Sequence, residues 1–296
     1  MKPSSAYDDA QSSLAGLESP GRRRFLRRAV AGAVFVAGLG GAGVSGRLRS
    51  REIIVPVPAL PPELSGFRIG VVSDLHRSTW VSEEHCRFAA ALAAGAACDV
   101  IVNLGDNVTG SAGYVRSALA GFREVDPPLG QFAVLGNHDH WNNPARITRA
   151  LEQAGFRVLT DEPVGLSRNG RELYMVGLDD ISVRSQPDLD APFRSVPGGA
   201  CVVVLSHNPD AIYHPRVRRS ALVLAGHTHG SQVLGANAFA ANCRYGRAHP
   251  HGLYREGDAQ IYVTSGVGLV LPPFRLGVPP EVAVITLQPA GLSEPA

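Results

Sequence analysis

The chain has 296 residues, of which 45% are hydrophobic and 18% are charged, so it can bury a sizeable core and global disorder is excluded. Its net charge of +2 conceals an asymmetry, because residues 1–51 carry nine basic and three acidic side chains, whereas residues 52–296 carry 19 and 23. This acidic main body argues against a nucleic-acid partner, and its lack of long apolar runs excludes a polytopic membrane protein.

The first 51 residues form a separate segment. Five arginines lie within residues 22–28, and an uncharged stretch rich in Ala, Val and Gly follows over residues 29–46. This layout is typical of an export signal, and the pair Arg22-Arg23 before x-Phe-Leu-Arg resembles a twin-arginine signal. We therefore expect the twin-arginine translocation machinery as a partner and a periplasmic location or one on the outer face of the cytoplasmic membrane. A retained N-terminal anchor is the alternative, with cleavage left open.

The remaining chain is expected to form one domain. Four prolines between residues 56 and 62 predict an extended linker leading into the domain over residues 52–66. The domain itself is expected over residues 67–288, followed by a disordered tail over residues 289–296.

Short apolar runs predict strands at residues 67–73, 100–104, 132–135, 164–167, 172–178, 202–205, 221–225, 260–264 and 282–287. Helical patterns separate the first of these runs, over residues 83–97, around 112–122, and over 144–154. This alternation predicts βαβ units and a largely parallel sheet, that is, an α/β fold. The dipeptide Asn169-Gly170 predicts a hairpin, because a type I′ turn requires positive φ at both central residues.

The four cysteines show no C-x-x-C spacing, so a structural zinc site is not expected. If Cys86 and Cys98 bracket one helix, they lie too far apart for a disulfide. Cys98 and Cys201 begin apolar strands and are interpreted as buried free thiols. For Cys243 the sequence leaves the redox state open.

Five expected strands end in residues that can bind a metal ion, namely Asp74, Asp106, Asn137, His207 and His227. In open α/β sheets ligands bind outside the carboxyl ends of the strands, so these five side chains are expected to converge on one site. His76 and His229 each follow two residues after such a position, on the same face of an extended segment.

Together these seven residues comprise two Asp, one Asn and four His, more than one metal ion needs. They suit two divalent or mixed-valence ions that share a bridging carboxylate. Mixed imidazole and carboxylate ligands favour Mn, Fe or Zn over Ca or Mg. Glycines before Asp106, Asn137 and His227 are expected to let the backbone turn sharply at the strand ends.

The order Asp-x-His, Gly-Asp, Gly-Asn-His-Asp, His and Gly-His-x-His resembles the signature of the calcineurin-like metallophosphoesterases. The resemblance covers residues 53–288, and four further segments look like the exported YkuE/YaeI-like phosphodiesterase branch: residues 176–180, 205–210, 226–232 and 279–282. It implies a four-layer α/β/β/α sandwich with a dimetal site at the sheet edges.

The resemblance also implies roles for the individual residues. One metal would be held by Asp74, His76 and His229, the other by Asn137, His207 and His227, with Asp106 bridging the two. A hydroxide between the metals would attack phosphorus in line. His138 would then stabilise the transition state and protonate the leaving oxygen, with Asp139 orienting its ring.

The sequence therefore predicts a metal-dependent phosphoesterase acting on a small-molecule or lipid phosphate ester, as a monomer with peripheral membrane association as an option. One alternative is a UDP-diacylglucosamine-type pyrophosphatase or an envelope phospholipid phosphodiesterase. Another is a catalytically silent metal-binding scaffold, against which the intact pair His138 and Asp139 argues. His140 and the basic loop over residues 244–252 could contact substrate or simply be solvated, and the sequence does not decide between these.

Overall fold

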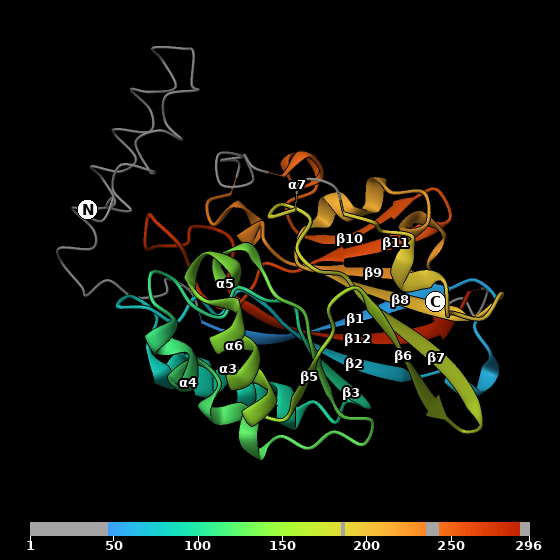
Figure 1. Cartoon of the computed structure of the whole chain (residues 1–296), viewed down its shortest axis with the longest axis horizontal. Coiled ribbons are helices and arrows are strands. Elements are labelled where there is room, and N and C mark those ends of the chain that lie inside the picture. Colours follow the sequence, from blue (N-terminus) through green and yellow to red (C-terminus); the bar gives the residue numbers. More distant parts are fainter. Residues whose placement is uncertain (1–46, 185–186, 235–242, 291–296) are drawn as a thin grey trace, which may run out of the picture.

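A computed structural model of the protein describes residues 47–184, 187–234 and 243–290 (Figure 1). Within these ranges two six-stranded sheets pack face to face, and helices cover their outer faces. The predicted α/β/β/α four-layer sandwich is therefore confirmed. None of the helices in these ranges is long and apolar enough to cross a membrane.

The first sheet has the strand order β1-β12-β2-β3-β4-β5. Its strands are β1 Arg49–Val57, β2 Phe67–Val72, β3 Val100–Asn103, β4 Gln131–Ala133, β5 Phe156–Val158 and β12 Glu281–Pro289. Strands β2 to β5 are parallel, as the alternation of strand and helix predicts, whereas β12 runs antiparallel to β2 and parallel to β1.

The second sheet has the order β10-β11-β9-β8-β7-β6. Its strands are β6 Glu162–Arg168, β7 Arg171–Gly177, β8 Cys201–Ser206, β9 Leu222–Ala225, β10 Gly252–Glu256 and β11 Ala259–Val263. Both edges are antiparallel hairpins around a parallel centre. The predicted turn at Asn169-Gly170 joins β6 to β7, with positive φ at both residues.

Regular helices cover the first sheet, and short ones cover the second. The α-helices are α3 Glu83–Gly95, α4 Val115–Ala118, α5 Asn137–Asn142, α6 Pro144–Gln153 and α7 Arg244–Ala248. The 3-10 turns are η1 Pro62–Leu64, η2 Ala112–Tyr114, η3 Ala120–Glu124, η4 Ala191–Phe193, η5 Pro209–Tyr213, η6 Val217–Arg219 and η7 His229–Ser231. Ser82 and Asn143 cap α3 and α6 through their side chains, which fixes where these helices begin.

Three buried clusters form the core. The largest lies between α3, α4, α6 and the first sheet, the second fills the space between the two sheets, and the third lies under η4, η5, η6 and α7. Inward-facing residues such as Phe67, Ile69 and Met175 are fully buried between the sheets. This packing fixes both sheets relative to each other, and with them the loops at their shared edge.

Two expectations about the chain need correction. The predicted linker over residues 52–66 is wrong for its first part, because residues 52–57 belong to β1, with Val55 and Val57 fully buried. Strand β1 lies at the edge of its sheet, where prolines are tolerated. The helix expected around residues 112–122 is broken into η2, α4 and η3.

The predictions for the two chain ends fall only partly on the described residues. Residues 1–46 of the predicted signal and residues 291–296 of the predicted tail lie outside the described residues. Within the described part, β1 begins at Arg49 and β12 continues to Pro289, so both boundaries of the folded domain extend beyond those expected. All four cysteines are free, as expected for Cys98 and Cys201.

Candidate metal centre

The seven predicted ligands come together at one edge of the sandwich. Asp74 and Asp106 follow β2 and β3, Asn137 opens α5 after β4, and His207 directly follows β8. Residues from both sheets are thus brought together because the parallel strands of both sheets end at the same edge.

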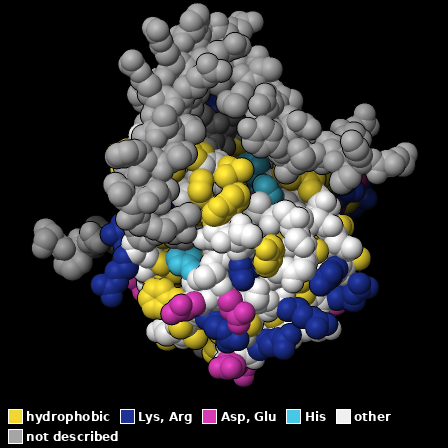
Figure 2. All heavy atoms as spheres, turned by 90° about the vertical axis from the view of Figure 1, so that its left-hand side faces the viewer, with side chains coloured by type: hydrophobic (Ala, Val, Ile, Leu, Met, Phe, Trp, Pro, Cys, Tyr) yellow, Lys and Arg dark blue, Asp and Glu magenta, His cyan; other side chains and the backbone are white. Residues whose placement is uncertain are grey.

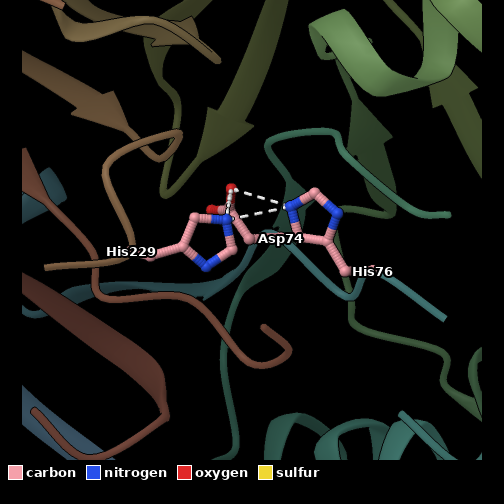
Figure 3. A group of neighbouring side chains, drawn as sticks. All are labelled: Asp74, His76 and His229. Atoms are coloured by element: carbon pink, nitrogen blue, oxygen red, sulfur yellow. Dashed lines mark hydrogen bonds and ion pairs between the residues drawn. The ribbon is translucent and has the colours of Figure 1, made fainter. Parts of the chain in front are cut away.

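We call Asp74, His76 and His229 the first half-site. Their side chains are buried and turned toward one another, as Figure 3 shows. The Nε2 atoms of His76 and His229 are 2.9 Å apart. Asp74 Oδ1 is 3.5 Å from His229 Nε2 and 3.8 Å from His76 Nε2. One carboxylate oxygen and two imidazole nitrogens therefore surround one position.

We call Asn137, His207 and His227 the second half-site. His207 Nε2 lies 3.2 Å from Asn137 Oδ1 and 3.1 Å from His227 Nδ1. The two half-sites therefore differ in which nitrogen points inward, since His227 presents Nδ1 and the other histidines present Nε2.

Asp106 lies between the half-sites. Its Oδ2 atom is 3.3 Å from His76 Nε2 and 3.3 Å from His207 Nε2. Its Oδ1 atom accepts a hydrogen bond of 2.8 Å from the main-chain N–H of His138. One carboxylate oxygen therefore reaches both half-sites, which is the arrangement that a bridging ligand requires.

The donor set fits cations. His207 Nδ1 lies 2.8 Å from the carbonyl oxygen of Leu104 and donates its proton there, so a neutral ring has a lone pair on Nε2. That lone pair faces Asn137 Oδ1 and the Asp106 carboxylate, which are also acceptors. Burial lowers the pKa of His207, but the charge of Asp106 outweighs it, and the pKa is raised well above its ordinary value. The geometry thus calls for positive charge at this point, which a metal ion supplies.

The two carboxylates are ready to bind cations. Burial raises the pKa of Asp74, but His229 and His76 outweigh burial and hold the pKa below its ordinary value. Burial likewise raises the pKa of Asp106, and His207 and His138 bring it well below the ordinary range. Both groups are therefore ionised at neutral pH.

The backbone is strained at most of the predicted ligands. Five of the seven have φ between 43° and 70°, in the left-handed region that non-glycine residues rarely adopt: Asp74, His76, Asp106, His227 and His229. Each such residue costs roughly 1–3 kcal/mol, which the surrounding fold must offset. Strain concentrated on polar residues at one edge is typical of a functional site.

The three glycines that precede ligands do not all allow a sharp turn, which corrects the expectation. Of Gly105, Gly136 and Gly226, only Gly105 has positive φ. Gly136 and Gly226 are needed for space, since a Cβ on Gly136 would collide with Asp106 Oδ1 and one on Gly226 with the Ser73 hydroxyl. Close approach of the loops therefore excludes side chains at both positions.

His138 lies beside His76 and Asp106. Its ring packs edge-on against His76, with centroids 4.7 Å apart, and its ring nitrogen is close enough to His76 and Asp106 to join a metal site. Burial lowers the pKa of His138 to about 4, partly opposed by Asp106. The ring is thus neutral at pH 7 in the absence of further negative charge.

Asp139 does not orient the His138 ring, which corrects the expected role. Within the described residues its carboxylate accepts hydrogen bonds from the main-chain N–H groups of Asp106, Asn107 and Gly136, at 2.8, 2.9 and 3.2 Å, and from the Asn107 side chain at 3.0 Å. Asp139 therefore fixes the loop that carries Asp106. Asp139 lies in the first turn of α5, and from there its side chain faces the loop after β3 and not the ring of His138.

Three supporting residues were not predicted. Thr109 Oγ1 lies 2.6 Å from His76 Nδ1. Arg275, itself only 3% exposed, donates to the carbonyl oxygens of His229 and of residues 265, 266 and 268. Asp180 is fully buried, and its Oδ2 atom has no hydrogen-bond partner within the described chain. The sequence signal for Asp180 was its place in the segment 176–180, which resembles the family, and the signal for Arg275 was a lone arginine in an apolar run.

The remaining histidines have structural partners. His140 Nε2 is 2.7 Å from Asp179 Oδ1, so it connects α5 to the loop after β7. This hydrogen bond and the charge of Asp179 raise the pKa of His140, and they outweigh burial, which lowers it. His249 stacks on Tyr245, with ring centroids 4.4 Å apart. The basic loop over residues 244–252 forms α7 and packs beside Gly230 through His251.

Comparison with known proteins agrees with this geometry. Residues 67–231 match the model of the calcineurin-like phosphoesterase family. The chain belongs to this family. It is 31% identical over 281 residues to phosphodiesterase YaeI of Escherichia coli (strain K12), covering 90% of this chain and 98% of that protein. It is 29% identical over 280 residues to the uncharacterized metallophosphoesterase YkuE of Bacillus subtilis (strain 168), covering 90% and 97%.

A third relative is longer than this chain. The transmembrane protein with metallophosphoesterase domain of Danio rerio is 27% identical over 254 residues, which cover 81% of this chain and 57% of that protein. Family membership and the cluster of His and Asp residues together make this calcineurin-like phosphoesterase a metal-dependent hydrolase of phosphate esters.

Proposed function

We propose that this protein is an exported phosphoesterase that uses two metal ions, one at each half-site. Asp74, His76, Asp106 and His229 would hold one ion, and Asp106, Asn137, His207 and His227 the other. The observation that carries this assignment is the position of Asp106 Oδ2, 3.3 Å from a histidine nitrogen of each half-site. The mixed oxygen and nitrogen ligands favour Mn, Fe or Zn.

When bound, the metal ions would supply Lewis-acid chemistry, by withdrawing charge from the phosphoryl group and activating water as the nucleophile. The chain's own residues then position and protonate the substrate. His138 is the residue best placed to give a proton to the leaving oxygen, because it lies next to His76 and the bridging Asp106 without belonging to either proposed set of ligands. A bound phosphate ester places negative charge beside this ring, which raises its pKa toward the range of a proton donor.

Asp139 is a positioning residue in this proposal. Its carboxylate holds the main chain of residues 106 and 107, and so fixes the direction in which the bridging carboxylate points. His140 fixes α5, which carries Asn137 and His138, to the second sheet through Asp179. The two sheets are thereby tied together across the site.

Export by the twin-arginine route is supported by the arrangement of the ligands along the chain. They extend from Asp74 to His229, so the metals can be held only after nearly the whole domain has folded. A route for folded proteins would let the cytoplasm choose the metal, whereas metal choice outside the cytoplasm would favour Cu and Zn.

The export proposal has a direct test. Replacing Arg22 and Arg23 by Lys keeps the charge but removes the guanidinium groups that a receptor would recognise. We expect the Arg22→Lys/Arg23→Lys variant to stay cytoplasmic, folded and active, while the parent is recovered outside. Export of this variant would point instead to an ordinary secretion signal or an anchor.

The catalytic proposal is tested by metal analysis of the purified full chain, combined with hydrolysis of an aryl phosphomonoester, an aryl phosphodiester and a UDP-sugar. We expect two metal ions per chain and turnover of at least one of the phosphate esters. Turnover of the UDP-sugar alone would favour the pyrophosphatase alternative. Two bound metals without any turnover would favour the silent scaffold.

A further inference from the structure

Three exposed leucines lie together beside the metal centre. Leu234, Leu271 and Leu276 are 70%, 55% and 63% exposed, and we call them the leucine rim. They come from two segments, one following η7 and the other between β11 and β12. Few large apolar side chains in the described chain are exposed to this extent. Three of them on neighbouring loops therefore need an explanation.

The leucine rim is held rigidly. Leu234 N–H donates to the Leu276 carbonyl, and Leu276 N–H donates to the Gln232 carbonyl, both at 2.8 Å. The buried Gln232 side chain also donates to the carbonyl oxygens of Val270 and Pro272, at 3.2 and 3.1 Å. These hydrogen bonds fix the backbone of both segments, and the fixed backbone keeps the leucine side chains exposed.

The same loops support the first half-site. The main-chain N–H of Gly268 donates to the Asp74 carbonyl at 2.7 Å, and Arg275 donates to the His229 carbonyl at 3.3 Å. The leucine rim therefore borders the metal centre. Figure 2, which faces this edge of the molecule, shows hydrophobic side chains gathered next to histidines.

A further exposed apolar side chain lies next to the site. Trp141 is 66% exposed, and its ring lies 4.8 Å from the ring of His138, centroid to centroid. Exposed apolar groups therefore adjoin the polar centre at His138 as well as at the leucine rim. Tryptophan is enriched where an apolar surface meets water at a membrane.

The chain enters the fold at this edge. Arg49, the first residue of β1, pairs with Glu281, and Glu281 N–H donates to the carbonyl of Gly266, which packs against Asp74. Strand β1 is two strands from β2, which places its start roughly 10 Å from the end of β2. The uncharged apolar stretch of residues 29–46 directly precedes this point in the sequence.

We propose that this edge of the protein lies on a lipid bilayer, with the leucine rim and Trp141 among the lipid chains, and that the substrate is a phosphate ester of a membrane lipid. This inference rests on the proposed function of the metal centre. Hydrolysis would add the oxygen of one water to phosphorus, break one P–O bond to an alcohol group, and leave the water's proton on that alcohol. A lipid phosphodiester would thus give a phosphomonoester and an alcohol.

A bilayer explains the arrangement better than a protein partner. A protein seated on the leucine rim and Trp141 would also cover the metal centre, which both adjoin. A lipid instead brings its phosphate to the site while its chains stay next to the apolar rim. The retained or transient apolar segment of residues 29–46, joined at the same edge, would hold the site close to the membrane.

The test uses the full chain with vesicles of phosphatidylglycerol and phosphatidylethanolamine, and a soluble aryl phosphodiester in parallel. The test variant is Leu234→Ser/Leu271→Ser/Leu276→Ser. The matched control is Ile54→Ser/Phe88→Ser, which removes two exposed apolar side chains on β1 and α3 that belong neither to the leucine rim nor to the metal centre. All three proteins carry the same N-terminal segment, so its own affinity for lipid cancels in the comparison.

We expect the rim variant to lose lipid hydrolysis by roughly tenfold or more, because up to three leucines no longer leave water on binding. Its turnover of the soluble ester should be unchanged, and the control should match the parent on both substrates. If the triple variant fails to fold, as judged by thermal melting, Leu271→Ser alone is measured in the same way and should show a smaller loss of the same kind.

Three outcomes would overturn the inference. Equal lipid hydrolysis by the rim variant and the parent would show that the leucine rim does not face the bilayer. Turnover of the soluble ester without any vesicle lipid hydrolysis would reject the substrate class and leave the proposed function standing. A dimer that becomes monomeric in the rim variant would make this face a contact between copies. Failure of the metal-loaded parent on both substrates would instead reject the proposed function itself.

Discussion

The two half-sites use the same kinds of ligand but support them differently. His207 in the second half-site is oriented by the main-chain carbonyl of Leu104, at 2.8 Å. His76 in the first half-site is oriented by the side-chain hydroxyl of Thr109, at 2.6 Å. A carbonyl at the end of β3 is present whatever the side chains are, whereas a hydroxyl depends on one residue. The second half-site is thus supported by the fold, and the first by particular side chains.

The surroundings of the half-sites extend this contrast. The first depends on the loop between β11 and β12, which includes Arg275. This loop donates hydrogen bonds to the main-chain carbonyls of Asp74 and His229. Both histidines of the second, His207 and His227, follow the ends of β8 and β9, two neighbouring parallel strands in the middle of a sheet. Substitutions outside the ligand set should therefore affect the first half-site more than the second.

Asp106→Asn should have the largest effect, because both half-sites lose their shared anionic ligand. We expect hydrolysis to be abolished and the metal content to fall at both half-sites. Metal analysis after dialysis, together with turnover of an aryl phosphate ester, measures this. Unchanged turnover would remove the dimetal mechanism altogether.

His138→Ala separates chemistry from metal binding. We expect both metals to remain bound while turnover falls by about 10²–10⁴-fold, the range for a positioned general acid. Metal content and kcat are measured on the same preparation. If occupancy of either half-site collapsed, His138 would be a ligand, as its distance to His76 and Asp106 would also permit.

Thr109→Val should have the smallest effect and tests the contrast between the half-sites directly. The buried His76 Nδ1 loses its partner, so we expect metal binding at the first half-site to weaken by about 10–100-fold. Binding at the second half-site should hardly change. A metal titration that resolves two binding events measures this, with Thr109→Ser as the control that keeps the hydroxyl. Equal weakening of both half-sites would contradict the difference in support.

Much of the site could be predicted from sequence because its residues follow strands directly. A strand of four to seven apolar residues is visible locally, and the residue after it must lie at the sheet edge. This is why Asp74, Asp106 and His207 were predicted with their surroundings unknown. The hairpin at Asn169-Gly170 was predictable for a similar local reason, since two residues determine the turn.

The errors share a different cause. Residues 52–57 begin the proline-rich run at Pro56 and were predicted as part of a linker, but pairing with β12, more than two hundred residues away, makes them a strand. Asp139 was assigned to the ring of its neighbour in sequence, yet it holds the loop after β3. In both cases a long-range hydrogen bond outweighed the local pattern, and such bonds leave no periodicity in the sequence.

The sequence by itself determined which residues could bind metal, the family they belong to, and the alternation of strands and helices, because these depend on residue type and local spacing. Only the tertiary structure decided the left-handed backbone at five ligands, the position of Asp106 between the half-sites, and the exposure of the leucine rim. Each of these depends on how distant loops pack against one another. The free energy that holds them comes from the whole core, so no single segment of sequence records it.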